Sequence, residues 1–393
     1  MSGHARKPNH LPEPRGPYVP GATDIMLDYS IDGVFLRVYY PTNVGKDDED
    51  NYRKWIPWIS DPSYADGIAS TLLLPPILIN TYMWWTGNPH IPVVYGERIR
   101  KTHKMKCVIL SHGLGGSRCL YSMICCELAS QGYIVFALEH RDKSAIHTYY
   151  YQNKEHAKQD SRTCVRYKRV HLNKDHFTKR NKQVNLRSKE CCKVLDLILG
   201  VNAGNVPHNV LDDVRYCEKR ESNFKLSDLI GCLDVDNVIM MGHSFGGASA
   251  LLTLARRPEL RLGVLLDPWM FSIKDDKLYE QIKQPLIFIN TQTFHISSNT
   301  EAMSRYMTNN NREMYTILHT THENQTDSVI LAGSWLNWFM KKLDPQMALR
   351  INNSLIMKFT STHIGYPEDV TEHEDLINEQ SRNIEKGLTK PWV

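Results

Sequence analysis

The amino-acid sequence predicts an α/β protein with a mostly parallel central sheet and helices on both of its faces. Three short apolar runs, Lys106–Ser111, Tyr133–Glu139 and Val238–Met241, have the length and composition of buried strands. Helical stretches separate these runs, and strands that alternate with helices indicate parallel pairing. Before them, Asp24–Ser30 and Phe35–Tyr40 predict an antiparallel hairpin. With 41% hydrophobic residues, the 393-residue chain can bury a sizeable core.

The first twenty residues are polar and contain five prolines, so we expect residues 1–20 to form a disordered arm. They have no apolar run of the kind found in signal peptides. Residue 2 is Ser, whereas N-myristoylation requires Gly there. We expect one folded domain over residues 21–366 and a polar, weakly structured tail over residues 367–393.

The segment Leu72–Trp85 is apolar and aromatic, but it is too short and too interrupted by proline to span a bilayer, which takes about 20 apolar residues. One interpretation is an element that dips into a lipid surface. The alternative is a segment that caps the core or lines a pocket. The side chains that would contact lipid are Leu72, Leu73, Leu74, Trp84 and Trp85.

Residues 141–190 form a basic insertion, with 14 lysines and arginines against five aspartates and glutamates. This excess of positive charge could attract phosphates or an anionic membrane surface. The interpretation we favour is a solvated, mobile insertion, followed by a helix over Lys189–Leu199.

The run Val238–Met241 leads directly into Gly242-His-Ser-Phe-Gly246, which is followed by small residues and a helix-forming stretch. This G-x-S-x-G pattern predicts a nucleophile elbow, a tight strand-to-helix turn with Ser244 at its tip. The flanking glycines allow backbone to pass where a Cβ would clash. A glycine-rich turn with an incidental serine is the alternative.

A serine nucleophile requires two backbone N–H groups that stabilise the oxyanion, each worth about 3–4 kcal/mol. The residue after the nucleophile, Phe245, supplies one of them. The loop His112–Gly116 resembles an HGGG-type motif and follows a predicted strand, so we expect the second donor at Leu114.

The base that activates the serine needs a carboxylate to orient it. Asp267 ends an apolar strand and lies 23 residues after Ser244. A buried carboxylate is costly unless it has a partner, which favours a functional role. The following strand ends in Asn290-Thr-Gln-Thr without an acid, which strengthens the choice of Asp267.

Five histidines follow the serine, and the base must be among them because the order is Ser, acid, His. His322 lies just past the predicted last strand, Glu313–His319, where a loop could bring it to the elbow. After this loop we expect a helix over Ser334–Lys342. Spacing alone gives His322 the same weight as the other four histidines together. These are His295, His319, His363 and His373.

Composition excludes several classes of protein. A formal charge of +4 is too small to indicate nucleic acid as the main partner. The nine cysteines form no Cys-x-x-Cys pair, and no P-loop or dinucleotide fingerprint is present. We therefore expect no metal and no cofactor, and reduced thiols in the cytoplasm, with contact to membranes at most peripheral. The sequence leaves the oligomeric state open.

Five motifs follow one another in the chain: Ser111-His-Gly-Leu-Gly, Leu120-Tyr-Ser, Glu139-His-Arg-Asp, Gly242-His-Ser-Phe-Gly-Gly and Leu266-Asp-Pro-Trp-Met-Phe. In sequence and order they resemble the platelet-activating factor acetylhydrolases, the group VII phospholipases A2. The likeness covers residues 17–365, with His322-Glu-Asn where the family has His-Gln-Asn.

This resemblance implies an α/β-hydrolase fold, a Ser244–Asp267–His322 triad and oxyanion donors at Leu114 and Phe245. It also implies calcium-independent removal of short or oxidised sn-2 acyl groups from phospholipids. The segment Leu72–Trp85 lies roughly where the family has a membrane-docking helix. The basic insertion is longer than the family pattern.

We therefore expect a serine esterase that acts on the sn-2 acetyl or short acyl ester of phospholipids. Trp269, beside the acid, is a candidate wall of the acyl pocket, with core packing as its alternative. A general carboxylesterase and an acetyl transferase are rival enzymes. A lipid-binding protein without turnover is the rival from another class.

Overall fold

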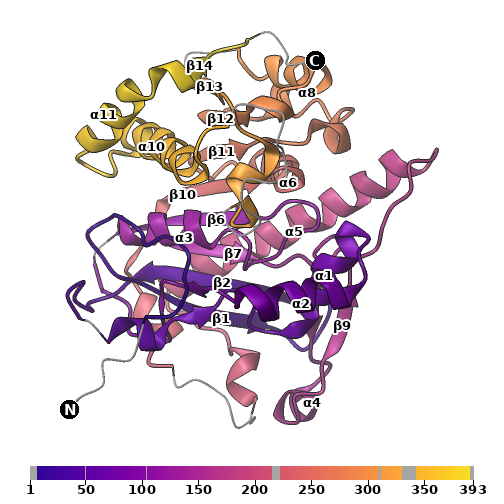
Figure 1. Ribbon diagram of the computed structural model, residues 1–393, viewed down its shortest axis with the longest axis vertical. Helices are drawn as coiled ribbons and strands as arrows, with labels where there is room; N and C mark the ends of the chain where they lie inside the picture. The colour runs from indigo at the N-terminus through magenta and orange to yellow at the C-terminus, as the bar shows by residue number, and fades with distance from the viewer. Residues whose placement is uncertain are drawn as a thin grey trace.

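A ten-stranded sheet forms the centre of the molecule. The computed structural model describes residues 7–48, 50–102, 104–214, 222–308, 311–329 and 342–389. The order across the sheet is β14-β13-β12-β11-β10-β6-β7-β2-β1-β5 (Figure 1). Neighbouring strands from β13 to β7 pair in parallel. Three pairs are antiparallel: β14 with β13, β2 with β7, and β1 with β2. The sheet strands are β1 (Pro20–Leu27), β2 (Val34–Pro41), β5 (Val94–Tyr95), β6 (Met105–Ser111), β7 (Ile134–Leu138), β10 (Leu233–His243), β11 (Leu262–Leu266), β12 (Leu286–Thr291), β13 (Arg312–Ile317) and β14 (Ile384–Lys386).

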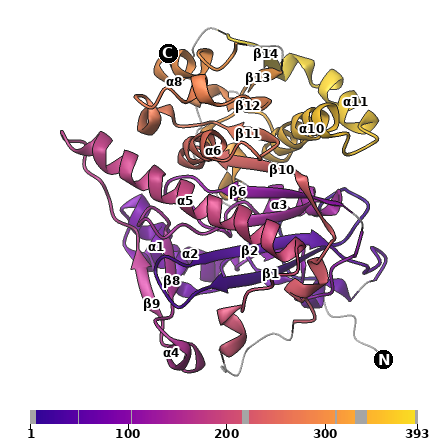
Figure 2. The ribbon, with the colours of Figure 1, turned by 180° about the vertical axis from the view of Figure 1, so that it is seen from behind.

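Helices cover both faces of this sheet. Helices α3 and α10 lie on the face seen in Figure 1, and α5 and α6 cross the face seen in Figure 2. The predicted layered α/β fold is therefore confirmed. Within the described residues, the α-helices are α1 (Pro62–Leu72), α2 (Pro76–Thr86), α3 (Ser122–Ser130), α4 (Lys154–Lys158), α5 (His176–Asn202), α6 (Phe245–Arg256), α7 (Leu278–Gln281), α8 (Ser297–Ser304), α10 (Pro345–Ile364) and α11 (Thr371–Glu379).

Each central strand divides its side chains between two cores. In β10, Val238 and Met240 belong to the core beneath α5 and α6, whereas Ile239 and Met241 belong to the core beneath α3 and α10. Successive residues of a strand point to opposite faces, and a strand covered on both sides is apolar throughout. This is why the run that precedes the elbow is continuously hydrophobic.

Residues 7–19 and 367–389 are more ordered than expected. Residues 7–19 have almost no regular structure, yet Leu11 is buried and donates its N–H to His90 O at 2.9 Å. Prolines prevent a helix here but not an extended segment that packs on the domain. The carboxy-terminal segment, expected to be weakly structured, forms α11 and then β14, which pairs with the edge strand β13.

The basic insertion is also folded, contrary to the expectation of a mobile segment. It contains β8 (His147–Tyr150), α4, β9 (Thr163–Arg166) and the first half of α5, which begins at His176 rather than Lys189. Strands β8 and β9 pair antiparallel in a separate ribbon. Arg180 and Arg187 lie on the buried face of α5. Because residues on the buried face of this helix are arginines, the hydrophobic periodicity of the sequence did not reveal an amphipathic helix here.

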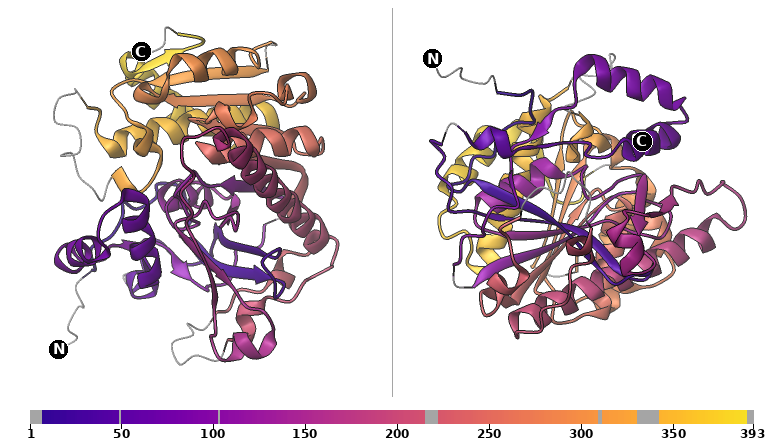
Figure 3. Two further views of the ribbon diagram at one scale, coloured as in Figure 1. Left: turned by 90° about the vertical axis from the view of Figure 1, so that its right-hand side faces the viewer. Right: turned by 90° about the horizontal axis from the view of Figure 1, so that it is seen from below.

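The apolar segment Leu72–Trp85 folds as the end of α1 and most of α2, and Pro75 and Pro76 stand at the start of α2. Proline is favoured in the first turn of a helix, so these residues initiate α2 rather than break it. The five side chains named above are exposed, with Trp84 at 83% and Trp85 at 79%. They do not cap the core. In the left view of Figure 3, the purple helices of this hairpin stand at the margin of the molecule.

The expected helix over Ser334–Lys342 lies outside the described residues, except for Lys342. Within the described part of the chain, no helix is long and apolar enough to cross a bilayer.

The elbow depends on a close approach between α6 and the end of β6. A Cβ placed on Gly246 would lie 2.0 Å from the carbonyl oxygen of Ser111. A Cβ on Gly242 would lie 2.1 Å from the carbonyl oxygen of Gly246. Only glycine allows the backbone of the turn to pack this closely on strand and helix.

We expect Gly246→Ala to lower the free energy of unfolding by about 1–3 kcal/mol or more, because the backbone must move to admit the methyl group. Gly200→Ala is the matched control. Its added Cβ would have no neighbour closer than 3.7 Å, and alanine favours the interior of α5 by about 0.5–1 kcal/mol. Denaturant unfolding measures both; equal stability of Gly246→Ala and the wild type would contradict the close-packing explanation.

Candidate active site

Ser244 stands between β10 and α6, at the carboxyl edge of the parallel strands. Its backbone has φ 56° and ψ −120°, a strained conformation for a residue with a side chain. The turn is held from both sides, because Ser244 N–H donates to Leu266 O at 2.8 Å and Ser244 O accepts from Trp269 N–H at 2.9 Å. This geometry is that of a nucleophile elbow.

Asp267 and His322 meet beside this turn. Nδ1 of His322 lies 2.9 Å from Oδ2 of Asp267, which is fully buried at the end of β11. The carboxylate also accepts hydrogen bonds from Thr291, through its backbone N–H at 2.6 Å and its hydroxyl. The end of β12 thus supplies donors to the acid rather than an acid of its own. His322 opens a short 3-10 helix, His322–Gln325, after β13.

The other four candidate histidines have different partners. His295 is buried against Thr389, and His373 bonds the hydroxyl of Ser354. His319 has a left-handed backbone beyond β13, and His363 lies in the last turn of α10 against Phe359. Of the five, His322 alone has a hydrogen bond to Asp267 among the described contacts.

Two further rings fix the orientation of the His322 imidazole. Phe294 stacks on it with the ring centroids 3.9 Å apart, and the ring centroid of His243 lies 4.5 Å from that of His322. Burial lowers the pKa of His243 well below its usual range. The neighbouring ring is therefore neutral and adds no positive charge beside His322.

The loop after β6 lies against the elbow. A Cβ on Gly113 would be 3.3 Å from Cβ of Ser244. Among the described residues, no hydrogen bond is formed by the N–H of Leu114, and Phe245 as the first residue of α6 has no intrahelical acceptor. The N–H groups of both expected oxyanion donors are thus not taken up by another described residue, and Phe245 directly follows the serine.

Tyr121 connects this loop to the elbow. Its hydroxyl accepts the N–H of Gly113 at 2.8 Å and lies 2.8 Å from Nδ1 of His243. Because the hydroxyl accepts from the loop, its own hydrogen is left for the His243 nitrogen. One fully buried side chain therefore sets the spacing between the two halves of the expected oxyanion hole.

Arg187 supports the same loop from beneath. Its side chain is completely buried on α5 and donates to the carbonyl oxygen of His112 at 2.5 Å. Its charge is balanced by Asp142 at 3.0 Å, and it also donates to the hydroxyl of Ser144 at 2.6 Å. Ser144 O in turn accepts the N–H of Gly115 at 2.8 Å. The basic insertion thus supplies part of the structural support of the site.

A second buried chain of hydrogen bonds lies behind the loop. The ring of His140 contacts the hydroxyl of Ser111 at 2.7 Å and the carboxyl of Glu190 at 2.6 Å. Burial lowers the pKa of His140 and raises that of Glu190 to about 7. Backbone N–H of His140 donates to Nε2 of His112 at 3.1 Å. This chain ties the ends of β6 and β7 to α5.

Asp327 anchors the segment that carries His322. Its buried carboxylate accepts the backbone N–H groups of Ser122 at 2.7 Å and Met123 at 2.9 Å, at the start of α3, and the indole N–H of Trp58 at 3.1 Å. Burial raises its pKa to about 6 in spite of these bonds. A carboxylate at a helix N-terminus is also favoured by the helix dipole.

Trp269 lies beside the elbow, partly buried, where its ring stacks on Phe271 and lies 5.7 Å from that of Phe245. This position is compatible with both roles expected for it, a pocket wall and core packing.

The side chains of His243, Asp267 and His322 bring three ligand-type atoms within 4.8 Å of one another. Both carboxylate oxygens and Nδ1 of each histidine take part in hydrogen bonds, which leaves Nε2 of His322 as the ring nitrogen with a free lone pair. The arrangement suits proton transfer better than metal binding.

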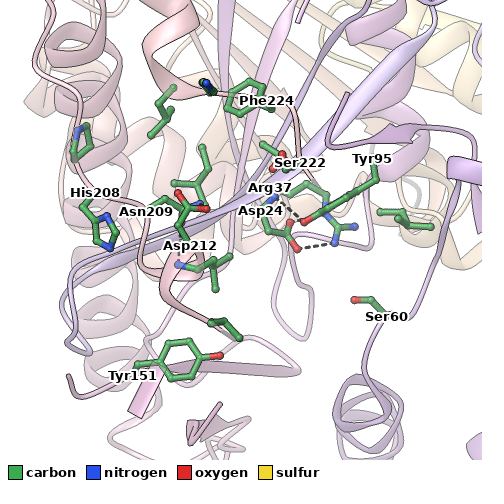
Figure 4. A pocket seen from close by; sticks show the side chains of 18 of the residues that line it. Asp24, Arg37, Ser60, Tyr95, Tyr151, His208, Asn209, Asp212, Ser222 and Phe224 are labelled. Carbon is green, nitrogen blue, oxygen red and sulfur yellow. Dashed lines mark hydrogen bonds and ion pairs between the residues drawn. The ribbon is translucent and has the colours of Figure 1, made fainter. Parts of the chain in front are cut away.

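A separate hollow of about 750 Å³ lies against β1 and β2 (Figure 4). Its lining includes Asp24, Arg37 and Tyr95, and Arg37 forms an ion pair with Asp24 at 2.7 Å. Neither Ser244 nor its two partners are among its lining residues. The candidate active site is therefore distinct from this hollow.

The mostly parallel sheet, the helices on both of its faces and the strand–turn–helix at Ser244 define a protein of the α/β-hydrolase fold. A ferulic acid esterase from Streptomyces cinnamoneus has a similar structure, with a TM-score of 0.63 over 96% of this chain and 99% of the esterase chain. The two sequences are only 14% identical, so this likeness concerns the fold.

Sequence comparison identifies the family. The profile of the family described as platelet-activating factor acetylhydrolase, isoform II, matches residues 4–384. Platelet-activating factor acetylhydrolase of Gallus gallus is 31% identical, with 98% of this chain and 91% of the relative aligned, and that of Canis lupus familiaris is 32% identical, with 98% and 84% aligned. A putative phospholipase A2 of Schizosaccharomyces pombe is 24% identical over 85% of this chain. The chain belongs to the platelet-activating factor acetylhydrolase family.

Sequence reasoning missed the supporting residues Tyr121, Arg187, Phe294 and Asp327. Asp327 follows His322 by five residues, and Tyr121 directly precedes α3, so proximity in the chain was a weak signal for both. For Arg187 the sequence indicated an exposed side chain, because an arginine in a basic stretch is normally solvated.

We expect Tyr121→Phe to lower kcat for ester hydrolysis about tenfold with little change in KM, because the oxyanion loop loses the acceptor that positions it. Tyr133→Phe is the matched control. That tyrosine is equally buried, and its hydroxyl bonds Thr360 and Tyr366 away from the site. Steady-state kinetics and thermal unfolding should show similar losses of stability in both variants but a loss of kcat in one. Equal kcat values would contradict a positioning role.

Proposed function

We propose that this protein is a calcium-independent serine esterase that hydrolyses the sn-2 acetyl, short or oxidised acyl ester of platelet-activating factor and related phospholipids. The observation that carries the proposal is the 2.9 Å bond from His322 to Asp267 beside the strained Ser244 turn, in a chain of this family. With Nδ1 bonded to the acid, Nε2 of His322 is the nitrogen left to face the serine hydroxyl.

In the proposed reaction, Ser244 Oγ attacks the ester carbonyl while His322 Nε2 takes the hydroxyl proton. The negative charge that develops on the carbonyl oxygen is stabilised by the N–H groups of Leu114 and Phe245. Asp267 stabilises the resulting imidazolium. His322 then gives its proton to the departing lyso-lipid oxygen, leaving an acyl-serine.

Water completes the cycle. His322 accepts a proton from a water molecule, which attacks the acyl-serine, and the collapse of the second tetrahedral intermediate returns the proton to Ser244 and releases the carboxylate. In this proposal Trp269 forms a wall of the acyl pocket. A closed end would reject long chains better than binding energy, because each methylene contributes only about 1–3 kcal/mol.

We also propose that α2 and the end of α1 contact the lipid surface from which substrate is taken. Leu72, Leu73 and Leu74 follow Thr71, whose methyl group would lie 3.3 Å from a Cβ on Gly115 of the oxyanion loop. The exposed apolar hairpin thus stands beside the site. Trp and Leu side chains of this kind partition into the interface of a bilayer.

The first prediction concerns the chemistry. Without calcium, phosphatidylcholines with short sn-2 chains should be hydrolysed, and chains near palmitoyl length should not. Ser244→Ala should reduce turnover by at least about a thousandfold, because the nucleophile is lost. A fluorophosphonate probe should label the wild type but not the variant. Undiminished turnover by Ser244→Ala would refute the mechanism, and acyl transfer to added lyso-lipid would identify a transferase.

The second prediction concerns the hairpin. Replacing Trp84 and Trp85 by alanine should weaken sedimentation with phosphatidylcholine vesicles about tenfold or more, since two large exposed side chains are removed from the interface. Hydrolysis of a soluble, monomeric ester should be unchanged. Replacing Leu388, which is also exposed but lies near the carboxy terminus, by alanine is the control. Equal vesicle binding by all three proteins would argue against the proposed contact.

A further inference from the structure

We infer that the segment 166–182, together with Lys143, is a docking surface for an anionic lipid bilayer and lies at the rim of the active site. This basic rim, as we call it, rests on the proposed function in one respect, that the partner is a lipid surface. Its argument otherwise depends on charge, exposure and position.

The basic rim is densely and almost exclusively cationic. Asp175 is the one acidic residue between positions 166 and 182, and it pairs with Lys179 at 3.4 Å. The other cations form no ion pair with the described residues. The exposed cations are Lys143, Arg166, Lys168, Arg169, Lys174, Lys179 and Lys182.

Backbone contacts fix the first end of the basic rim beside the oxyanion loop. Lys168 N–H donates to Lys143 O at 2.9 Å, and the next residue, Ser144, accepts the N–H of Gly115 at 2.8 Å. Lys143 is exposed between two buried residues, Asp142 and Ser144. Positive charge therefore begins directly above the loop expected to hold the oxyanion.

Aromatic packing fixes the second end. The rings of His176 and Phe177, in the first turn of α5, pack on Phe271 with centroids 5.2 and 5.8 Å away. Phe271 stacks in turn on Trp269, whose backbone bonds Ser244. Helix α5 continues into the buried core through Arg187. The rim is thus attached to the site at both ends.

The basic rim and the apolar hairpin lie on the same side of the molecule. Both Figure 1 and Figure 2 place α1, β9 and the amino-terminal end of α5 on one side. Asp61, which caps α1, also forms an ion pair with Arg162, just before β9. A bilayer that receives α2 would therefore face the cations as well.

The apolar content of the rim favours a bilayer over other polyanions. Leu172, at its tip, is 88% exposed, and it stands among lysines and arginines. A lipid interface accepts an apolar side chain between phosphate groups, whereas a nucleic acid backbone offers it no apolar environment. Each lysine or arginine near an anionic leaflet adds to the attraction, and the effect decays within about 10 Å.

Vesicle sedimentation tests this inference on full-length protein. The protein carries Ser244→Ala in every sample, so that binding is measured without hydrolysis. Vesicles contain phosphatidylcholine alone or with phosphatidylserine. The test variant replaces Lys168, Arg169, Lys174 and Lys179 by Gln. The matched control makes the same change in net charge at the opposite, amino edge of the sheet, replacing exposed Arg98, Lys101, Lys104 and Lys225.

We expect phosphatidylserine to strengthen binding of the parent and the control at least about tenfold, and high salt to remove this gain. The test variant should lose the gain but keep its binding to phosphatidylcholine. Equal losses in test and control variants would reduce the effect to net charge and overturn the inference, as would a parent indifferent to phosphatidylserine. Competition by inorganic phosphate alone would indicate a site for free phosphate instead. Because binding is the readout, failure of the proposed esterase activity would leave this result standing.

Discussion

The candidate site depends on one tight constraint, the contact of the elbow with the ends of three neighbouring strands. Ser244 has a positive φ, and its N–H and carbonyl groups bond to residues on both sides of Asp267. Gly246 allows α6 to approach the carbonyl group of Ser111, at the end of β6. A strained residue persists only where its surroundings determine it. Here those surroundings are backbone groups, so nucleophile, acid and oxyanion loop share one rigid frame.

Buried polar groups extend this frame outward. Tyr121 spans the oxyanion loop and His243, Arg187 holds the loop from α5, and Asp327 ties the His322 segment to α3. Each group would be costly to bury alone and is stable because its partners are supplied by other elements. Positional precision thus comes from side chains that need not touch substrate themselves.

The rim of the site has two different surfaces. Helices α1 and α2 expose leucine and tryptophan, and the basic rim exposes lysine and arginine on the same side of the molecule. Apolar contact and charge attraction act on different features of a lipid surface and respond differently to salt. Under the two proposals, the basic rim selects anionic membranes by charge, and the apolar hairpin contacts the lipid from which substrate is taken.

The local chemistry was readable from the sequence, whereas long-range support was not. The strand, G-x-S-x-G turn and helix around Ser244 form a continuous stretch, and the apolar strands require helices on both faces. Asp267 could be placed because it ends such a strand. Spacing left His322 open against four other histidines, because a loop can carry a side chain in any direction. Only the tertiary structure decided which ring meets the acid, that Arg187 is buried, and that the tail completes the sheet edge with β14. Those outcomes depend on contacts between distant segments of the chain. The partner of a buried charge comes from such a segment, and no local sequence pattern indicates it.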